Sequence, residues 1–183
     1  YYRWEIAFSK EEMTDAVISV LNERKSLMEE CVQIENEAGE FVTGEIPDIG
    51  TVENVEVAER TSSGVVSKLI IQGSEHTIAI TGQSHVRAIL SPEKQKIKKQ
   101  DGSVITGWTS LPSPYYYVEK TNDGFIVYGG GFGHGAGMSI YGAGVLGRQR
   151  KNYKYILRQY FSYIDFASIY SMQDEAVENK DTE

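Results

Sequence analysis

The chain has 183 residues, 40% of them hydrophobic and 24% charged, a globular composition that excludes a disordered chain and leaves too little length for two domains of ordinary size. Its 26 acidic residues outnumber 18 basic ones, and the charge of −8 argues against nucleic acid as the main partner, because phosphate contacts need clustered Lys and Arg. The single cysteine, Cys31, excludes an internal disulfide and a thiolate-rich metal centre, and no apolar stretch approaches the roughly 20 residues of a membrane span.

The first predicted elements are a strand and an amphipathic helix. Residues 2–8 alternate well enough for a strand. Ser9 and Glu12 have the spacing of a capping box, in which each side chain bonds the other residue's backbone N–H. Apolar residues then follow the i, i+3, i+4, i+7 spacing of a helix: Met13, Ala16, Val17, Val20 and Leu21. From 26 to 50 the pattern is acidic and irregular, with one short helix or strand.

The middle of the chain predicts antiparallel strands joined by tight turns. Residues 51–61, 65–71 and 77–81 form a meander, with turns at Ser62-Ser63-Gly64 and Gly73-Ser74. Ser84 is suited to cap a short helix over 85–90.

Two hairpins follow this helix. Asp101-Gly102 predicts one, and residues 115–119 and 125–128 are expected to pair as another across residues 121–124. In the first of these strands, alternation places Tyr116 on the face opposite Tyr115 and Tyr117.

The last third predicts helices. Ser139 is the expected N-cap of one helix, and Asn152 of a second over 153–161. Residues 163–170 favour a final strand, and 174–183 a polar tail. The sum is an α+β fold, an antiparallel sheet of meander and hairpins with helices near the N- and C-terminal ends, forming one domain over 1–173.

Glycines concentrate in one segment. Nine of the eighteen lie between Gly129 and Gly147, around His134. Residues without a Cβ let the backbone turn tightly and let a bulky ligand lie against the main chain. A titratable imidazole among them indicates a site. His134 is expected either to take part in a site or to hold the loop through neighbouring carbonyls.

A dinucleotide site is the alternative for this segment, because Gly131 to Ala136 satisfies G-x-G-x-x-A between a strand and a helix. The context argues against it, since no βαβ unit or later acidic residue accompanies the motif. His76 and His85 stand alone, so neither a metal nor another cofactor is expected.

The run from Gly131 to Ala143, Gly-Phe-Gly-His-Gly-Ala-Gly-Met-Ser-Ile-Tyr-Gly-Ala, resembles the signature of the SpoIID/LytB family, known for stage II sporulation protein D. Further segments resemble that family in the same order: 1–5, 57–64, 82–90 and 153–161. The resemblance implies a peptidoglycan lytic transglycosylase that cuts denuded glycan strands. The alternative that it implies is a non-catalytic cell-wall-binding or amidase-enhancing module.

In the transglycosylase reaction, a Glu protonates the glycosidic oxygen and then deprotonates the sugar 6-hydroxyl that attacks the anomeric carbon. The family's Glu lies in a Glu-x-Pro motif before the segment Tyr1-Tyr-Arg-Trp4. Because this chain begins there, and without Met, we expect the acid upstream. Glu45-Ile46-Pro47 matches Glu-x-Pro, but it lies after the segment Tyr1–Trp4, whereas the family's motif lies before that segment.

The resemblance also implies a site and a location. His134 takes a supporting catalytic role, and the substrate-binding residues are Gly131, Gly133, Gly135, Gly137, Ser139 and Tyr141. The expected partners are peptidoglycan glycan strands and other cell-wall hydrolases. The expected location is extracytoplasmic, in the bacterial cell envelope.

Overall fold

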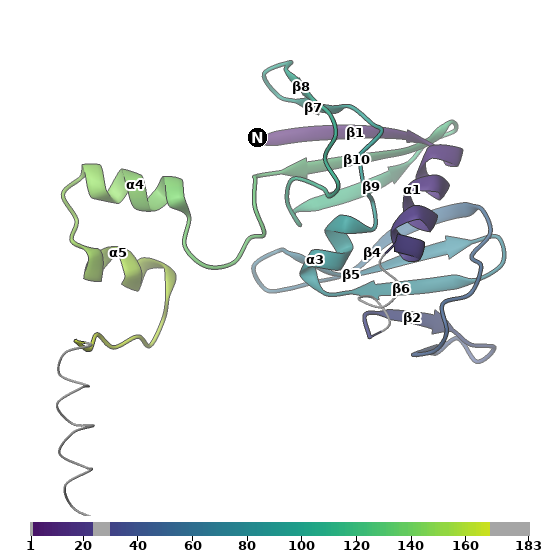
Figure 1. Ribbon diagram of the computed structural model, residues 1–183, viewed down its shortest axis with the longest axis horizontal. Helices are drawn as coiled ribbons and strands as arrows, with labels where there is room; N and C mark the ends of the chain where they lie inside the picture. The colour runs from purple at the N-terminus through teal and green to yellow at the C-terminus, as the bar shows by residue number, and fades with distance from the viewer. Residues whose placement is uncertain (1, 24–29, 169–183) are drawn as a thin grey trace, which may run out of the picture. The chain divides into compact units, whose positions relative to one another are not determined.

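The computed structural model describes residues 2–23 and 30–168 (Figure 1). The chain divides into two compact units, Tyr1–Gly135 and Ala136–Glu183. The first holds two antiparallel sheets and the helices packed on them, and the described part of the second, residues 136–168, holds two helices. The predicted α+β class is therefore confirmed. The predicted domain over 1–173 stays a prediction.

Sheet A has five strands in the order β8-β7-β1-β10-β9. Their bounds are β8 Val104–Ile105, β7 Ile97–Lys99, β1 Arg3–Ser9, β10 Gly124–Gly130 and β9 Tyr116–Lys120. All neighbours are antiparallel. The two predicted hairpins, β7–β8 and β9–β10, are confirmed, and β1 lies between them.

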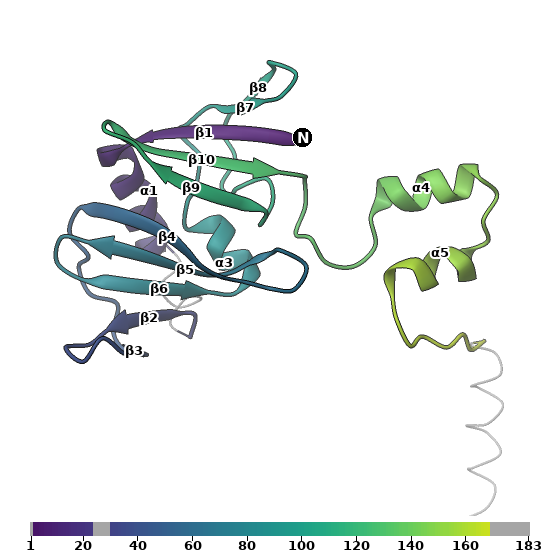
Figure 2. The same ribbon diagram turned by 180° about the vertical axis from the view of Figure 1, so that it is seen from behind.

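Sheet B has five strands in the order β3-β2-β6-β5-β4. Their bounds are β3 Phe41–Val42, β2 Val32–Glu35, β6 Thr77–Thr81, β5 Val66–Gly73 and β4 Val52–Arg60. The predicted meander is β4-β5-β6, and β2 and β3 come from the segment expected to be irregular. Sheet B adjoins sheet A where β4 lies beside β9 (Figure 2).

Helix α1, Lys10–Glu23, begins with the predicted capping box. The Ser9 N–H donates to Glu12 Oε2 at 2.8 Å, and the Glu12 N–H donates to Ser9 Oγ at 3.1 Å. The apolar stripe of α1 is buried, and the helix packs against β1 and β10 of sheet A and β4 of sheet B.

Helix α3, Gln83–Ala88, packs on β5 and β6. The prediction that Ser84 caps this helix is wrong: the N-cap is Gly82, with φ 88°, and no side chain bonds the free N–H groups. At that φ a residue with a side chain would be strained, so the cap position of α3 holds Gly82, and Ser84 lies inside the helix.

The core of the first unit lies between the sheets and the two helices (Figures 1 and 2). Each inner face contributes alternate residues of its strands, as the pleat requires. The largest fully buried side chains are Ile6, Met13, Ile49, Leu69, Ile71, Ile78, Ile80, Ile89, Leu90, Ile97 and Leu111.

The second unit contains α4, Ile140–Arg148, and α5, Tyr153–Tyr160. Both predicted caps are confirmed: Ser139 Oγ accepts from the Gly142 N–H, and Asn152 Oδ1 accepts from the Tyr155 N–H. The strand predicted over 163–170 is wrong for 163–168, which are irregular, while 169–170 and the tail 174–183 lie outside the described residues. No helix among the described residues is long and apolar enough to cross a membrane.

Candidate functional site

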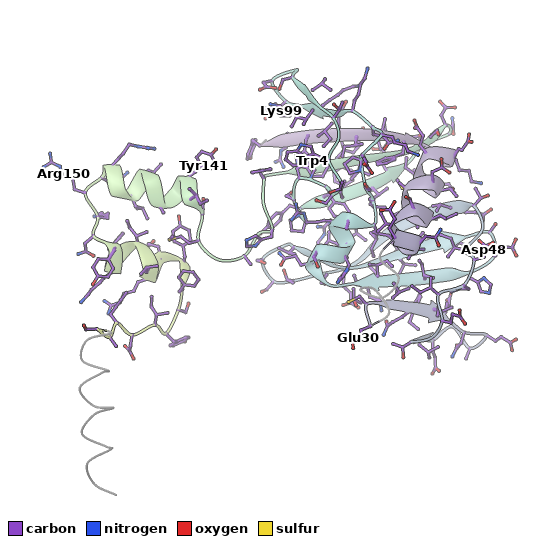
Figure 3. The ribbon with its side chains drawn as sticks, viewed as in Figure 1. Trp4, Glu30, Asp48, Lys99, Tyr141 and Arg150 are labelled. Carbon is purple, nitrogen blue, oxygen red and sulfur yellow. The ribbon has the colours of Figure 1, made fainter. Side chains whose placement is uncertain are left out.

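A groove runs over sheet A of the first unit and has a volume of about 920 Å³. Strands β1, β7, β9 and β10 form most of it, and the turn after β4 closes one side. Figure 3 labels Trp4 and Lys99, lining residues from β1 and β7. The lining residues are Arg3, Trp4, Glu5, Arg60, Gly64, Lys98, Lys99, Gln100, Gly102, Val104, Tyr115, Tyr116, Tyr117, Tyr128, Gly129 and Gly130.

A row of four side chains crosses the floor of this groove. Strand register pairs Lys98 with Glu5, Glu5 with Tyr128, and Tyr128 with Tyr117. Directly opposed residues share a face of a sheet, so the row lies on one face, opposite the buried Ile6 and its neighbours.

The row joins an ion pair to an aromatic pair. Lys98 Nζ lies 3.3 Å from Glu5 Oε1. The rings of Tyr117 and Tyr128 are stacked, with centroids 5.1 Å apart and planes 25° apart. Tyr117 is 53% exposed. The groove therefore offers flat apolar faces directly beside charged hydrogen-bonding groups.

The pKa of the Tyr128 phenol is raised above its ordinary value, so the phenol is protonated at neutral pH. The main cause is desolvation, and the carboxylates of Glu119 and Glu5 and the side chain of Tyr117 raise the pKa further. A phenol held in this state keeps its O–H as a hydrogen-bond donor toward the groove.

Three hydrogen bonds hold the side of the groove nearest β4. Arg60 donates through Nη2 to the Tyr116 carbonyl at 2.6 Å and through Nη1 to the Gly64 carbonyl at 3.1 Å. The Tyr116 hydroxyl donates to the Val86 carbonyl of α3 at 2.6 Å. These bonds tie β9 to α3 and to the turn after β4, so the groove wall is positioned by the core.

The end of β10 shapes the floor by omitting side chains. A Cβ on Gly129 would overlap the ring of Trp4, and a Cβ on Gly130 would lie 2.9 Å from Arg3 Nη1. Trp4 is buried and donates from Nε1 to the Gly131 carbonyl at 3.2 Å. These two glycines therefore make room for side chains of β1.

The predicted site loop continues directly from this strand and is exposed around His134. Gly131, Gly133 and Gly135 have φ values of 80°, 107° and 78°, which disfavour any residue with a side chain. The Gln83 amide donates to the His134 carbonyl. A Cβ on Gly135 would lie 2.9 Å from the ring of Tyr115, a groove residue, so the loop adjoins the groove.

The remaining predicted site residues lie in the second unit. Gly137 precedes α4 with φ 71°, Ser139 caps that helix, and Tyr141 is 85% exposed in its first turn. None of the predicted site residues lines the groove. Their shared role in a site stays a prediction.

Glu45-Ile46-Pro47 lies between β3 and β4, with Ile46 packed against the core, and it does not line the groove either. Within residues 2–23 and 30–168, no group of three His, Cys, Asp or Glu side chains could hold a metal ion.

A family model described as “Domain of unknown function (DUF8618)” matches residues 30–137, more than half of the chain. The chain belongs to this family. The match includes thirteen of the sixteen groove-lining residues, all except Arg3, Trp4 and Glu5. The groove is therefore largely a feature of the DUF8618 segment.

The DUF8618 match corrects the resemblance drawn from the glycine run. The chain is not identified as a SpoIID/LytB protein, since the matching family is DUF8618 and a relative from Brachyspira hyodysenteriae is itself uncharacterized. The physical reason lies in the run itself: its glycines are explained by positive φ and by close packing of Trp4 and Tyr115. Backbone geometry of this kind does not specify one family.

Other comparisons cover little of the chain. An uncharacterized protein of Brachyspira hyodysenteriae is 38% identical over 55 residues, which are 30% of this chain. The match spans 15% of the length of that relative. No solved structure matches the chain.

Sequence reasoning missed the groove residues. Two features of the sequence were weak signals of the groove: the alternation of residues 3–5 and the run Tyr115-Tyr116-Tyr117. Strand register places Tyr117 and Tyr128 on the same face of the sheet. The approach of β7 to β1, which brings Lys98 to Glu5 over 93 positions of sequence, had no local signal.

Proposed function

We propose that the first unit, which contains most of the DUF8618 match, binds a carbohydrate polymer in the groove over sheet A. The observation that carries the proposal is the stacked pair Tyr117 and Tyr128 beside the Glu5–Lys98 ion pair. A non-catalytic glycan-binding role needs only these features, and it agrees with one of the two functions expected from the sequence.

The aromatic pair suits the apolar face of a sugar ring. Aromatic faces carry negative charge density, and the C–H groups on one side of a pyranose are weakly positive, so the two surfaces attract. The exposed Tyr117 ring and the Tyr128 ring at its side form a continuous platform.

The charged residues suit the hydroxyl groups at the ring edge. Glu5 offers acceptor oxygens, and Lys98 and Arg3 offer donors, all from the groove-lining face of sheet A. Such a small number of placed polar groups beside aromatic surface is typical of a site that fixes the orientation of its ligand.

The dimensions favour a polymer over a single sugar. The row from Lys98 to Tyr117 crosses four neighbouring strands, and strands lie about 4.8 Å apart, so it extends for about 14 Å. That length exceeds one pyranose ring. A groove of about 920 Å³ agrees with several linked units.

Single-stranded nucleic acid also binds aromatic and basic grooves, but the charge of the unit argues against it. Residues 1–135 contain twelve Lys and Arg and twenty Asp and Glu. A surplus of acidic residues repels a phosphate backbone and leaves a neutral or sparsely charged polymer unaffected.

Peptidoglycan glycan is the polymer expected from the sequence, and it belongs in the test. The proposal covers binding alone. Glu5, the acidic residue that lines the groove, is ion-paired with Lys98, so the transglycosylase reaction and its upstream acid stay predictions.

The test is binding of the purified full chain to insoluble peptidoglycan, chitin and cellulose, followed by titration with soluble oligosaccharides of the retained polymer. Tyr128→Ala is expected to weaken binding about tenfold, since one aromatic contact contributes roughly 1–1.5 kcal/mol beyond its buried area. Tyr117→Ala is expected to have a similar effect.

The matched control is Tyr163→Ala, because Tyr163 is fully exposed in the second unit. It should leave affinity unchanged. Retention of none of the polymers, or equal affinity of Tyr128→Ala and the parent chain, would contradict the proposal. His134→Ala separates the two candidate regions: a loss confined to this variant would place the site at the predicted loop and away from the groove.

A further inference from the structure

The second unit, called the helical unit below because it contains α4 and α5, exposes large apolar side chains. Neither α4 nor α5 has a buried residue. Ile140 is 84% exposed, Tyr141 85% and Val145 43%. Exposed apolar side chains gathered in one place indicate a surface that contacts another molecule.

These residues occupy one side of α4. Tyr141, Val145 and Arg148 follow i, i+4, i+7 spacing, with Ile140 beside them. The opposite side faces α5, because a Cβ on Gly142 would overlap the hydroxyl of Tyr160. The side of α4 that carries Ile140, Tyr141, Val145 and Arg148 is called the outer face of α4 below.

Cations lie at the C-terminal end of this outer face. Arg148 ends α4, and Arg150 follows it with φ 60°. Figure 3 labels Tyr141 at the start of α4 and Arg150 beyond its end, and both side chains extend away from α5. The face therefore runs from apolar residues to guanidinium groups.

The whole described part of the unit is basic. Residues 136–168 contain five basic residues and one acidic residue, Asp165, whereas residues 169–183 contain one basic and five acidic residues, so the cations of the second unit are concentrated around its two helices. Further cations lie over aromatic rings: Lys151 over Tyr155 at 4.8 Å, and Arg158 over Phe166 at 5.2 Å. Such a segment is attracted to anionic partners.

We infer that the outer face of α4 contacts an anionic lipid surface, with Ile140, Tyr141 and Val145 entering the interface and Arg148 and Arg150 reaching lipid phosphates. Amphipathic helices with exposed aliphatic and aromatic residues beside Lys and Arg lie in the plane of a bilayer surface. Nine residues of α4 extend about 13.5 Å, which suits contact along the surface.

A soluble polyanion satisfies only part of this surface. It pairs with the arginines, but it offers no apolar region for Ile140 and Val145. A lipid surface offers both, because anionic headgroups lie directly above hydrocarbon. This inference goes beyond glycan binding, since it concerns residues after the DUF8618 match, which ends at 137.

The test uses the full chain and vesicles of phosphatidylcholine with one quarter phosphatidylglycerol, compared with phosphatidylcholine alone, in a sedimentation assay. Binding is expected for the anionic vesicles and is expected to fall as salt screens the charges. Arg148→Gln with Arg150→Gln should weaken partitioning about twenty-five-fold, at roughly fivefold for each cation. Ile140→Ser should weaken it on the order of tenfold.

Matched variants keep the result specific. Lys94→Gln with Lys96→Gln removes two exposed cations from the first unit, and Val42→Ser removes an exposed apolar side chain from β3. Both should bind like the parent. Circular dichroism checks that α4 and α5 remain folded. Absence of binding to anionic vesicles, equal losses in the control variants, or binding to a DNA oligomer without vesicle binding would overturn the inference.

Discussion

Gly129→Ala is expected to destabilise the Tyr1–Gly135 unit by about 2–3 kcal/mol, because it overfills a closely packed interior. Gly129 is buried in β10, directly opposite Trp4 in the strand register. A Cβ there would overlap Cζ2, Cη2 and Cε2 of the Trp4 ring, which is 3% exposed and hydrogen-bonded to the Gly131 carbonyl. Urea unfolding followed by tryptophan fluorescence measures the change, since both tryptophans lie in this unit.

Two further variants show whether the clash is the cause. Gly44→Ala is the control, because its Cβ would meet only the end of the Ile34 side chain, at 3.3 Å. It should cost well under 1 kcal/mol, as most exposed substitutions do. In a Trp4→Leu background, Gly129→Ala should cost much less than in the parent, because the two sites are in contact and their effects are not additive. Additive costs would contradict the explanation.

Gly129 also shows that one residue type in the sequence can have more than one structural cause, while the ligand site predicted at this loop stays a prediction. The sequence interpretation took the missing side chains as space for a ligand. In the structure, Gly129 and Gly135 make space for Trp4 and Tyr115, and Gly131, Gly133 and Gly137 have positive φ with open space around them. Both causes produce the same letter in the sequence, so composition alone could not separate them.

Local patterns predicted most of the fold correctly. The capping box Ser9–Glu12 and the caps Ser139 and Asn152 depend on residues three positions apart. The meander depends on turn residues between alternating strands. Such interactions are decided within a few residues, so they can be read from the chain directly. The cap of α3 was the exception, since Gly82 competes there with Ser84.

The groove could not be predicted in the same way, because it depends on register between distant segments. Glu5 meets Lys98 and Tyr128, which lie 93 and 123 positions further along the chain. A shift of one residue in the pairing of β1 with β10 would place Tyr128 on the buried face, and the same shift in the pairing of β1 with β7 would do so for Lys98. The alternation that places Tyr116 and Tyr117 on opposite faces was predicted correctly, but which of the two is buried and what lies beside Tyr117 were not predicted.

The charge of the chain is also unevenly placed, which the total of −8 conceals. Residues 1–135 contain twelve basic and twenty acidic residues, residues 136–168 five and one, and residues 169–183 one and five. The argument against nucleic acid, drawn from the total, holds for the groove unit alone. The helical unit needs an argument of its own, and its exposed Ile140 and Tyr141 provide one.

Tyr116→Phe is expected to destabilise the first unit by about 2 kcal/mol at neutral pH, because a buried polar pair loses one partner. The Tyr116 hydroxyl donates to the Val86 carbonyl of α3 at 2.6 Å, and the side chain is 3% exposed. The variant fills nearly the same volume, so the loss reports the hydrogen bond. Urea unfolding at pH 7 measures it.

The same residue predicts a dependence on pH. Burial raises the pKa of the Tyr116 phenol above its ordinary value, with a smaller opposing effect of Arg60. The unfolded chain releases this proton near pH 10, while the folded chain retains it. The contribution is therefore fully present below about pH 10 and is lost as pH rises beyond it, by up to about 1.4 kcal/mol per pH unit.

The difference between parent and variant isolates this proton from other groups that titrate in the same range. The parent should exceed Tyr116→Phe by about 2 kcal/mol at pH 7, and the gap should narrow as pH rises above about 10. Tyr117→Phe is the matched control at pH 7, since Tyr117 is 53% exposed; at that pH it should unfold like the parent. A difference in stability that stays constant between pH 9 and 11 would show that folding does not keep the Tyr116 phenol protonated. In that case the hydrogen bond from Tyr116 to α3 would not be what positions the groove wall.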